Sequence, residues 1–163
     1  MITIPTAPFF DTTIHDRESK MNQLTLNAKA KINLTLEIFD KRKDGYHEMR
    51  SVMHKIGLFD VVKVSVDTER ADDNAGEIRV ICSKPVCDEK DNLAYKAADS
   101  FMSLYYKKTG KVFACNIEIE KNIPDKAGLG GGSSDCAAVL DALSKLLGAV
   151  SEKEKEELAA SLG

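Results

Sequence analysis

The sequence lacks the features of a membrane protein, a secreted protein or a metal protein. No uninterrupted apolar run approaches the ~20 residues that a membrane-spanning helix needs, and no basic segment followed by an apolar one opens the chain. The four cysteines include no CxxC pair, and the three histidines are not spaced to join them around a metal. We therefore expect a cytoplasmic protein with reduced thiols, no metal ligands of its own and no membrane partner.

An excess of positive charge is also missing. Lysine and arginine number 23 against 26 acidic residues, which gives a formal net charge of -3. A field of this sign gives no general reason to expect nucleic acid as a partner. Any anionic ligand must therefore be bound by a local arrangement of residues.

The organisation is that of one globular domain without repeats. At 163 residues, 43% of them hydrophobic, the chain is long enough for one core and too short for two full domains. Residues 1–20 show no periodicity and are predicted to be an N-terminal tail. The domain is predicted to span residues 21–163.

Strand patterns dominate the first half of the domain. From Leu24 to Ile38 every even position is apolar, which predicts one long half-buried strand or a bent pair. This parity places Lys31 and Asn33 side by side on the face away from the core. Asp44-Gly45 predicts an exposed turn. Further alternation predicts strands at Val52–Ile56, Val62–Val66, around Ile78 and Val80, and from Phe113 to Ile119.

Three helical stretches accompany the strands. The first is predicted to begin at Asp91 as N-cap and to end at Gly110, the second to follow a glycine-rich segment and end at Gly148, and the third to begin at Ser151 in a capping box with Glu154. About five strands and three helices in this order indicate an α+β fold.

The segment PDKAGLGGGSS, from Pro124 to Ser134, points to function. Its glycines, Gly128, Gly130, Gly131 and Gly132, permit positive φ angles and let a phosphate approach the backbone, and the helix that follows directs its N-terminal dipole at the same point. A tight turn alone would need fewer glycines. The segment therefore predicts an anion site.

Two well-known phosphate loops do not fit this segment. A Walker A loop has a lysine before its serine or threonine, whereas Ser133 follows Gly132 directly. A dinucleotide fingerprint needs a third glycine where Ser133 stands, and it lies earlier in its domain.

Three motifs together resemble the GHMP kinase superfamily. They are AKAKINLTLEI around Lys31, DGYH at Asp44 to His47, and PDKAGLGGGSSD, in the family's order, and the similarity runs from about Leu24 to Gly163. Within the superfamily the chain is similar to the kinases that phosphorylate 4-diphosphocytidyl-2-C-methyl-D-erythritol in non-mevalonate isoprenoid biosynthesis. The resemblance implies the N-terminal ATP-binding lobe of the family, a ribosomal-protein-like mixed sheet packed with helices.

The resemblance also implies site residues. Lys31 matches the catalytic lysine, Asn33 would help to place the substrate, and Tyr46 and His47 match the pair that grips the cytosine ring. Magnesium would be held through the ATP phosphates. ATP would be bound by the loop and two outlying residues: Pro124, Asp125, Lys126, Ala127, Gly128, Leu129, Gly130, Gly131, Gly132, Ser133 and Ser134, with Asn92 and Lys121.

One family element is not found in the sequence. The family's catalytic base is an aspartate in a Gly-Ala-Asp-Val-Pro context, and only the first residue of that context, Gly163, is present. Asp125 and Asp135 are poor replacements. We expect the second lobe to be absent, the chain to have little or no kinase activity alone, and the apolar surface left uncovered to promote self-association.

Two other functions are compatible with the sequence. One is a non-catalytic nucleotide-binding or interaction module of the same fold. The other is an RNA-binding module, for which a local basic group speaks and the net charge and the glycine loop do not. Without the resemblance, Lys31 reads as a solvated strand lysine and Tyr46 and His47 as turn residues. The basic group consists of Lys29, Lys31, Lys41, Arg42 and Lys43.

Overall fold

A single mixed sheet with helices on one face makes up the part of the chain that the computed structural model describes, residues 12–13, 22–41, 45, 47–69 and 76–162. The strand order is β1-β2-β3-β5-β4, and only β4 and β5 are parallel. This confirms the predicted α+β class. The strands are β1 (Thr12–Thr13), β2 (Asn22–Lys41), β3 (His47–Asp67), β4 (Ile78–Cys82) and β5 (Ala114–Glu120).

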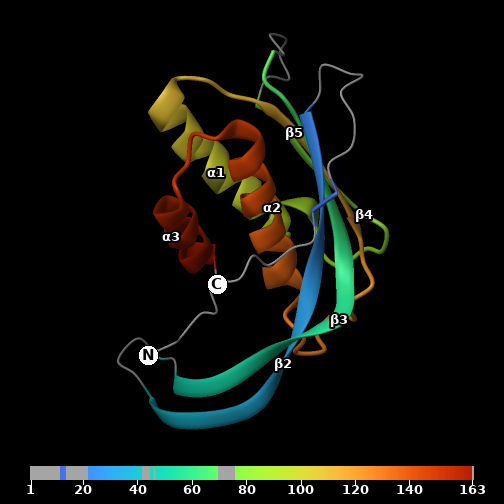
Figure 1. Ribbon diagram of the computed structural model, residues 1–163, viewed down its shortest axis with the longest axis vertical. Helices are drawn as coiled ribbons and strands as arrows, with labels where there is room; N and C mark the ends of the chain where they lie inside the picture. Colours follow the sequence, from blue (N-terminus) through green and yellow to red (C-terminus); the bar gives the residue numbers. More distant parts are fainter. Residues whose placement is uncertain (1–11, 14–21, 42–44, 46, 70–75, 163) are drawn as a thin grey trace.

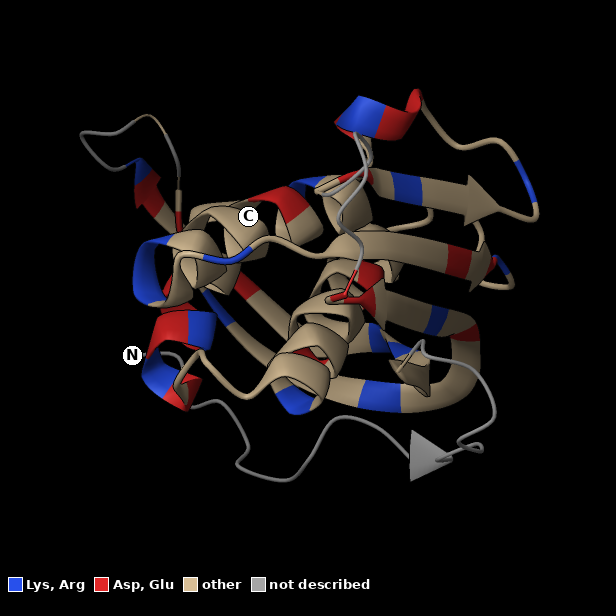
Figure 2. Ribbon diagram, turned by 90° about the horizontal axis from the view of Figure 1, so that it is seen from above, with Lys and Arg blue, Asp and Glu red and all other residues tan. Residues whose placement is uncertain are grey.

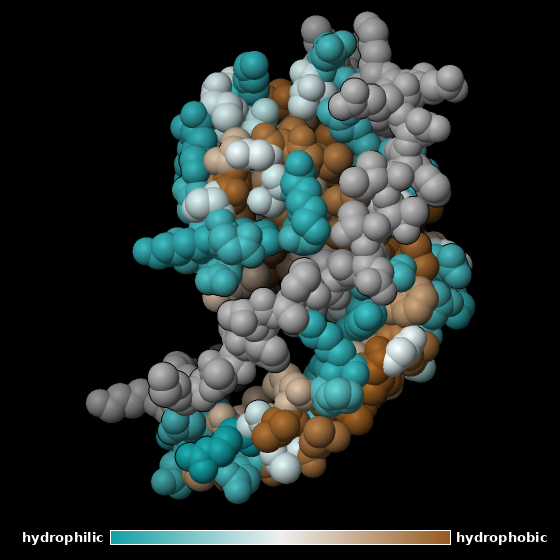
Figure 3. Space-filling model, viewed as in Figure 1, coloured by the Kyte–Doolittle hydropathy of each residue, from teal (hydrophilic) through white to brown (hydrophobic). Residues whose placement is uncertain are grey.

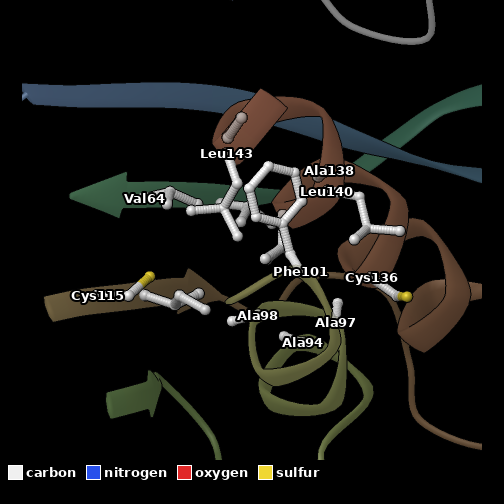
Figure 4. Packing of buried hydrophobic residues seen from close by; sticks show 14 of the residues in the cluster. Val64, Ala94, Ala97, Ala98, Phe101, Cys115, Cys136, Ala138, Leu140 and Leu143 are labelled. Carbon is white, nitrogen blue, oxygen red and sulfur yellow. The ribbon is translucent and has the colours of Figure 1, made fainter. Parts of the chain in front are cut away.

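The helices cover one face of the sheet (Figure 1). They are α1 (Leu93–Thr109), α2 (Gly131–Leu147) and α3 (Glu152–Leu162), with a 3-10 turn, η1 (Glu89–Asp91), before α1. Phe101 of α1 and Leu143 of α2 meet Val64 of β3 between the two layers (Figure 4). All three side chains are fully buried. The core is therefore closed by alternate residues of the central strands and one stripe on each of the two long helices.

The cysteines belong largely to this core. All four are free thiols, as the sequence predicts, and Cys115 and Cys136 are buried. Burial raises the pKa of Cys115 to about 12 and that of Cys136 to about 11. These two side chains act as small hydrophobes.

The helix ends follow the sequence with one correction. Gly110 and Gly148 end α1 and α2 in the left-handed conformation, and Ser151 and Glu154 form the predicted capping box of α3. The prediction that Asp91 caps α1 is wrong. Asn92 is the cap, because its side chain accepts the backbone N–H of Ala94 at 2.9 Å, while Asp91 lies in η1.

β2 and β3 are longer than the rest of the sheet. The stretches Val52–Ile56 and Val62–Val66, predicted as two strands, are one continuous strand that pairs with β2 as far as Lys41. The even positions of β2 are buried only from Leu24 to Ala30. A register shift between Lys29 and Lys31 then separates the buried part from the exposed part.

Beyond that shift the two strands extend past the ends of the helices as a curved two-stranded arm (Figure 1). We call residues 32–41 and 47–58 the distal ribbon. Large apolar side chains gather along it (Figure 3). The exposed ones are Leu34, Leu36, Ile38, Phe39, Met49, Val52, Met53 and Leu58. The alternation from Leu24 to Ile38 had predicted that the even positions of this strand face a core.

Two expectations fall at the edge of the described residues. Within the predicted tail, Thr12 and Thr13 pair with Leu26 and Thr25 of β2, and the remainder of residues 1–20 lies outside the described part. The same holds for Asp44 and Tyr46 of the predicted turn. In the described segments no helix is long and apolar enough to cross a membrane.

Candidate functional site

The glycine loop connects β5 to α2 and contains three unusual backbone conformations. Gly128 and Gly130 have φ angles of 72° and 74°, and Lys126, a non-glycine residue, has a φ of 55°. Left-handed backbone is costly for a side-chain-bearing residue and persists where surrounding contacts fix it. The loop is therefore held in a specific shape, as the sequence predicts for Gly128 and Gly130.

The start of α2 provides the anion-binding element. Gly130 is the N-cap, and helix geometry leaves the N–H groups of Gly131, Gly132 and Ser133 without partners inside the helix. No acidic residue lies in the first turn to occupy them. A pocket of about 140 Å³ opens at this point, lined by Lys121, Ile123 and every residue from Pro124 to Gly132. Unpaired amides and the helix dipole suit this pocket to a phosphate.

Lys31 lies directly against the loop. A Cβ added at Gly130 would lie 3.2 Å from Cγ and 3.3 Å from Cε of Lys31, so a larger residue there would press on this side chain. The backbone N–H of Lys31 donates to the carbonyl of Leu129 at 2.9 Å. On the other side of the bulge, the Ser134 hydroxyl donates to the carbonyl of Lys29 at 2.8 Å. The two strand residues on either side of this register shift thus both bond to the end of the loop that leads into α2.

Two more polar side chains lie near Lys31. Its ammonium is 3.5 Å from Oδ1 of Asn33, which confirms that these residues share one side of the strand. Lys55 of β3 stands opposite Lys31 in the register. Burial, followed by the charge of Lys29, lowers the pKa of Lys55. Lys29, Lys31 and Lys55 therefore lie close together on the two strands, and sequence analysis missed Lys55 because strand pairing places it opposite Lys31.

The predicted adenosine residues lie on the opposite side of α2's first turn. Asn92 caps α1 and donates from its amide to Sγ of Cys82, the last residue of β4, at 3.5 Å. Next to it, Leu93 would be 3.5 Å from a Cβ at Gly132. Asn92 thus lies beside the loop. Its position in the sequence, after η1, does not by itself indicate this proximity.

Lys121, the other predicted adenosine residue, is bound to two carboxylates. Its ammonium donates to Oδ2 of Asp60 at 2.5 Å and to Oδ2 of Asp135 at 2.6 Å. The side chains of all three residues are at least nine-tenths buried. Asp60 also accepts the backbone N–H groups of Asn122 and Ile123 through Oδ1, at 2.5 and 2.8 Å. Lys121 is therefore a structural tie below the loop as well as part of the pocket lining.

Asp135 is the member of this network whose negative charge is least compensated by hydrogen-bond donors. Among the described residues no hydrogen-bond donor reaches its Oδ1, although that atom is buried. Burial, opposed by Lys121 and reinforced by Asp60, raises the pKa of Asp135 to about 7.

Sequence reasoning missed Asp60. It lies between the two predicted strands Val52–Ile56 and Val62–Val66, where a polar residue in an exposed turn would be expected, yet its side chain is completely buried. The available signal was an acidic residue at the even position directly before the alternating apolar run Val62–Val66, in register with its buried side chains.

The predicted cytosine pair is not brought to the loop by the described residues. His47 opens β3 at the end of the distal ribbon, where it pairs with Lys41, ten residues beyond Lys31 along β2. Tyr46 lies outside the described part. The structure thus gathers Lys31, Asn33, Asn92 and the loop, and leaves His47 apart.

Outside this site, the part of the chain that the structure describes shows no concentration of positive charge. Lysines and arginines alternate with acidic residues over the strands and helices instead of forming one basic face (Figure 2). Within the described segments, no group of three or more His, Cys, Asp or Glu side chains could hold a metal ion. The loop, the start of α2 and Lys31 therefore make up a candidate anion site, which would depend on backbone amides and local lysines.

Comparison with known sequences identifies related proteins. Residues 92–163 match the family model "GHMP kinases N terminal domain". The 4-diphosphocytidyl-2-C-methyl-D-erythritol kinase of Desulfitobacterium hafniense (strain Y51) is 44% identical over 143 residues, which are 87% of this chain and 45% of that protein. The Geobacter sulfurreducens protein of the same name is 41% identical over 145 residues, 88% of this chain and 48% of that protein.

Solved structures give the same result. A crystal structure of 4-(cytidine 5'-diphospho)-2C-methyl-D-erythritol kinase superposes with a TM-score of 0.61 at 36% identity, over 85% of this chain and 46% of that one. A homoserine kinase from Cytophaga hutchinsonii superposes with a TM-score of 0.57 at 17% identity, over 92% of this chain and 43% of that one, and shows the fold alone. The chain spans about half the length of the curated relatives it matches.

Proposed function

Residues 92–163 carry a GHMP kinase N-terminal domain, and on this premise we propose that the chain serves ATP-dependent phosphorylation of 4-diphosphocytidyl-2-C-methyl-D-erythritol. The relatives that bear this activity in their names are 41–44% identical to most of the chain. Phosphoryl transfer needs positioning and charge neutralisation more than covalent catalysis. The arrangement of loop, helix start and lysine is of that kind.

The contact between Lys31 and Gly130 carries the proposal. It places an ammonium-bearing side chain against the residue that caps α2, so one cation lies beside the helix start whose N–H groups face the pocket. Such a pair suits a transferring phosphoryl group, on which negative charge is spread over several oxygens. Lys31 is accordingly the catalytic lysine of the proposal, and Asn33 beside it helps to place the acceptor hydroxyl.

ATP fits the residues present. The loop from Pro124 to Ser134 takes the phosphates through its backbone, and Asn92 and Lys121 border the space beside it for the nucleoside. Magnesium is held through the ATP phosphates and supplies charge neutralisation when bound. Tyr46 and His47 take the cytosine ring at the far end of the substrate.

Binding of Mg-ATP to the full chain is the first measurement. We expect saturable binding by isothermal titration, weakened about tenfold in Lys31→Met and unchanged in Lys63→Met, whose lysine lies on the neighbouring strand in a surface pair with Glu118. Absence of saturable binding would overturn the proposal. Preferential binding of RNA with a steep dependence on salt would instead support the RNA-binding alternative.

Product formation separates a kinase from a non-catalytic nucleotide module. Incubation with Mg-ATP and 4-diphosphocytidyl-2-C-methyl-D-erythritol, followed by mass spectrometry, is expected to show only a trace of phosphorylated product, because the family's catalytic aspartate is not found in this sequence, and Lys31→Met should abolish that trace. ATP binding with no product at any protein concentration would favour the module without chemistry.

A further inference from the structure

Beneath the phosphate loop lies a buried ionic network, of which the proposed function uses only Lys121. Asp60 comes from β3, Lys121 follows β5 and Asp135 belongs to the first turns of α2. The network therefore joins the three elements that meet at the pocket. Taking three charges out of water is costly unless their hydrogen bonds are completed, so its position calls for an explanation beyond packing.

Its contacts fix both ends of the loop. Asp60 accepts the N–H groups of Asn122 and Ile123, where the chain leaves β5. Ile123 in turn lies under α2, because a Cβ added at Gly131 would be 3.1 Å from its side chain and 3.6 Å from Oδ2 of Asp60. The carboxylate of Asp60 is thus close to the first residue of the helix whose N–H groups face the pocket.

The charges of the network do not balance. Two carboxylates share one ammonium, and one oxygen of Asp135 has no donor among the described residues. The uncompensated negative charge lies near the point where the proposed function places the phosphates of ATP. A protonated Asp135 would make the network neutral and leave its bond from Lys121 to Oδ2 in place.

We propose that Asp60, Lys121 and Asp135 form a positioning unit for the phosphate loop, and that Asp135 takes up a proton from solvent when a nucleotide polyphosphate binds. The proton adds to the unpartnered Oδ1, no covalent bond breaks, and the unit changes from a net charge of -1 to zero. The polyphosphate drives this uptake because it adds negative charge near an already under-compensated carboxylate.

Other ionisable groups near Asp135 are few. Cys82 at the end of β4 and Cys136 on α2 interact with its charge, and burial raises the pKa of both thiols, so neither is a competing source of negative charge. From β2, Lys31 approaches Gly130, on the loop side of the pocket. Next to this end of α2, α1 presents Asn92 and Leu93, which do not titrate.

Asp141 offers a matched control on the same helix. It is also bound to lysines, Lys145 at 2.8 Å and Lys155 at 2.9 Å, but it lies beyond the first turns of α2 and contacts none of the loop residues. Hydrogen bonds from these lysines lower the pKa of Asp141 against the effect of burial. Asp141→Asn therefore removes a paired aspartate without touching the proposed unit.

Proton uptake is measured by titrating Mg-ATP into the full chain at pH 7.5 in buffers of different ionisation enthalpy. Since the inference rests on the proposed function, we expect up to about half a proton per bound nucleotide in the wild type and in Asp141→Asn. Asp135→Asn is expected to take up close to none while still binding. Equal uptake in Asp135→Asn and the wild type would overturn the proton-accepting role.

A second measurement does not depend on nucleotide. In amide NMR spectra of the free chain, we expect the resonances of Asn122, Ile123 and Gly131 to titrate near pH 7 in the wild type and in Asp141→Asn but not in Asp135→Asn. Asp60→Asn should accelerate hydrogen exchange at Asn122 and Ile123 at least tenfold, because it disturbs the group that accepts their N–H bonds. Unchanged loop amides in both variants would overturn the positioning unit.

The two measurements separate the two proposals. Loop amides that titrate as expected in a chain that fails to bind Mg-ATP would overturn the nucleotide function and leave the positioning unit standing. Nucleotide binding without any variant effect on the loop amides would overturn the unit and leave the function standing.

Discussion

The two halves of the β2–β3 pair have the same partners and the same alternating pattern but opposite environments. In the half nearer the helices, Leu26 and Val62 are fully buried opposite each other. In the distal ribbon, Ile38 and Met49 are also opposite each other and are 63% and 54% exposed. The difference arises from the helices, which cover only the first half (Figure 1). Alternation therefore reports strand geometry, and burial depends on what packs above it.

Buried and exposed ion pairs differ in the same way. Lys121 and its two carboxylates lie in the covered half, next to the loop, whereas Lys63 and Glu118 form a pair at 3.3 Å on the open face. A buried pair that loses one partner leaves an uncompensated charge, while an exposed one is replaced by water.

The largest effect is expected for Lys121→Met. It leaves Asp60 and Asp135 buried without a cation, and we expect a loss of about 3–5 kcal/mol in the free energy of unfolding, measured in urea without nucleotide. Lys63→Met is the matched control and should lose under about 1 kcal/mol. Equal losses in the two variants would contradict the view that the Lys121 network is effectively desolvated.

The pH dependence of stability is the next effect in size. The pKa of Asp135 is about 7 in the folded chain and close to 3.8 when unfolded, so the folded state binds the proton more tightly. This contribution to stability is complete below pH ~4 and is lost as the pH rises to about 7, at about 1.4 kcal/mol per pKa unit. Thermal unfolding from pH 5 to 8 should show the wild type losing stability relative to Asp135→Asn as the pH rises; a constant difference, or a relative gain by the wild type, would contradict this prediction.

Gly130→Ala tests the close contact at the loop. The new methyl group would be strained at a φ of 74° and would press on the side chain of Lys31. We expect Mg-ATP to bind about tenfold more weakly, by isothermal titration, and the free energy of unfolding to fall by about 1 kcal/mol or more. Gly57→Ala on β3, where nothing lies within 4 Å of the added group, should bind as the wild type does. Equal affinities would show that this contact is dispensable.

The smallest effect concerns the distal ribbon. Its exposed apolar side chains are expected to promote self-association of the chain, which light scattering at rising protein concentration would detect. Ile38→Lys should lower the apparent mass with little change in stability. Ile81→Lys is the control, because Ile81 is similarly exposed, at 58%, but lies on β4 away from the ribbon. A monomer at all concentrations would contradict the expectation.

Local sequence determined most of the elements and the centre of the site. Glycine at positions 128 and 130 marks where left-handed backbone is needed, and Gly110 and Gly148 mark helix ends, because each of these properties depends on one residue and its neighbours. The parity of β2 correctly paired Lys31 with Asn33. The α+β class followed from the order of the patterns.

Tertiary structure decided what surrounds these residues. Strand pairing brings Lys55 opposite Lys31, and packing of α2 on β3 brings Asp60, Lys121 and Asp135 together from positions 61 and 14 residues apart. Which apolar residues of β2 are buried was likewise settled by where the helices end. Local patterns record the conformation of a segment, whereas desolvation and charge balance depend on contacts between segments, and these exist only in the folded chain.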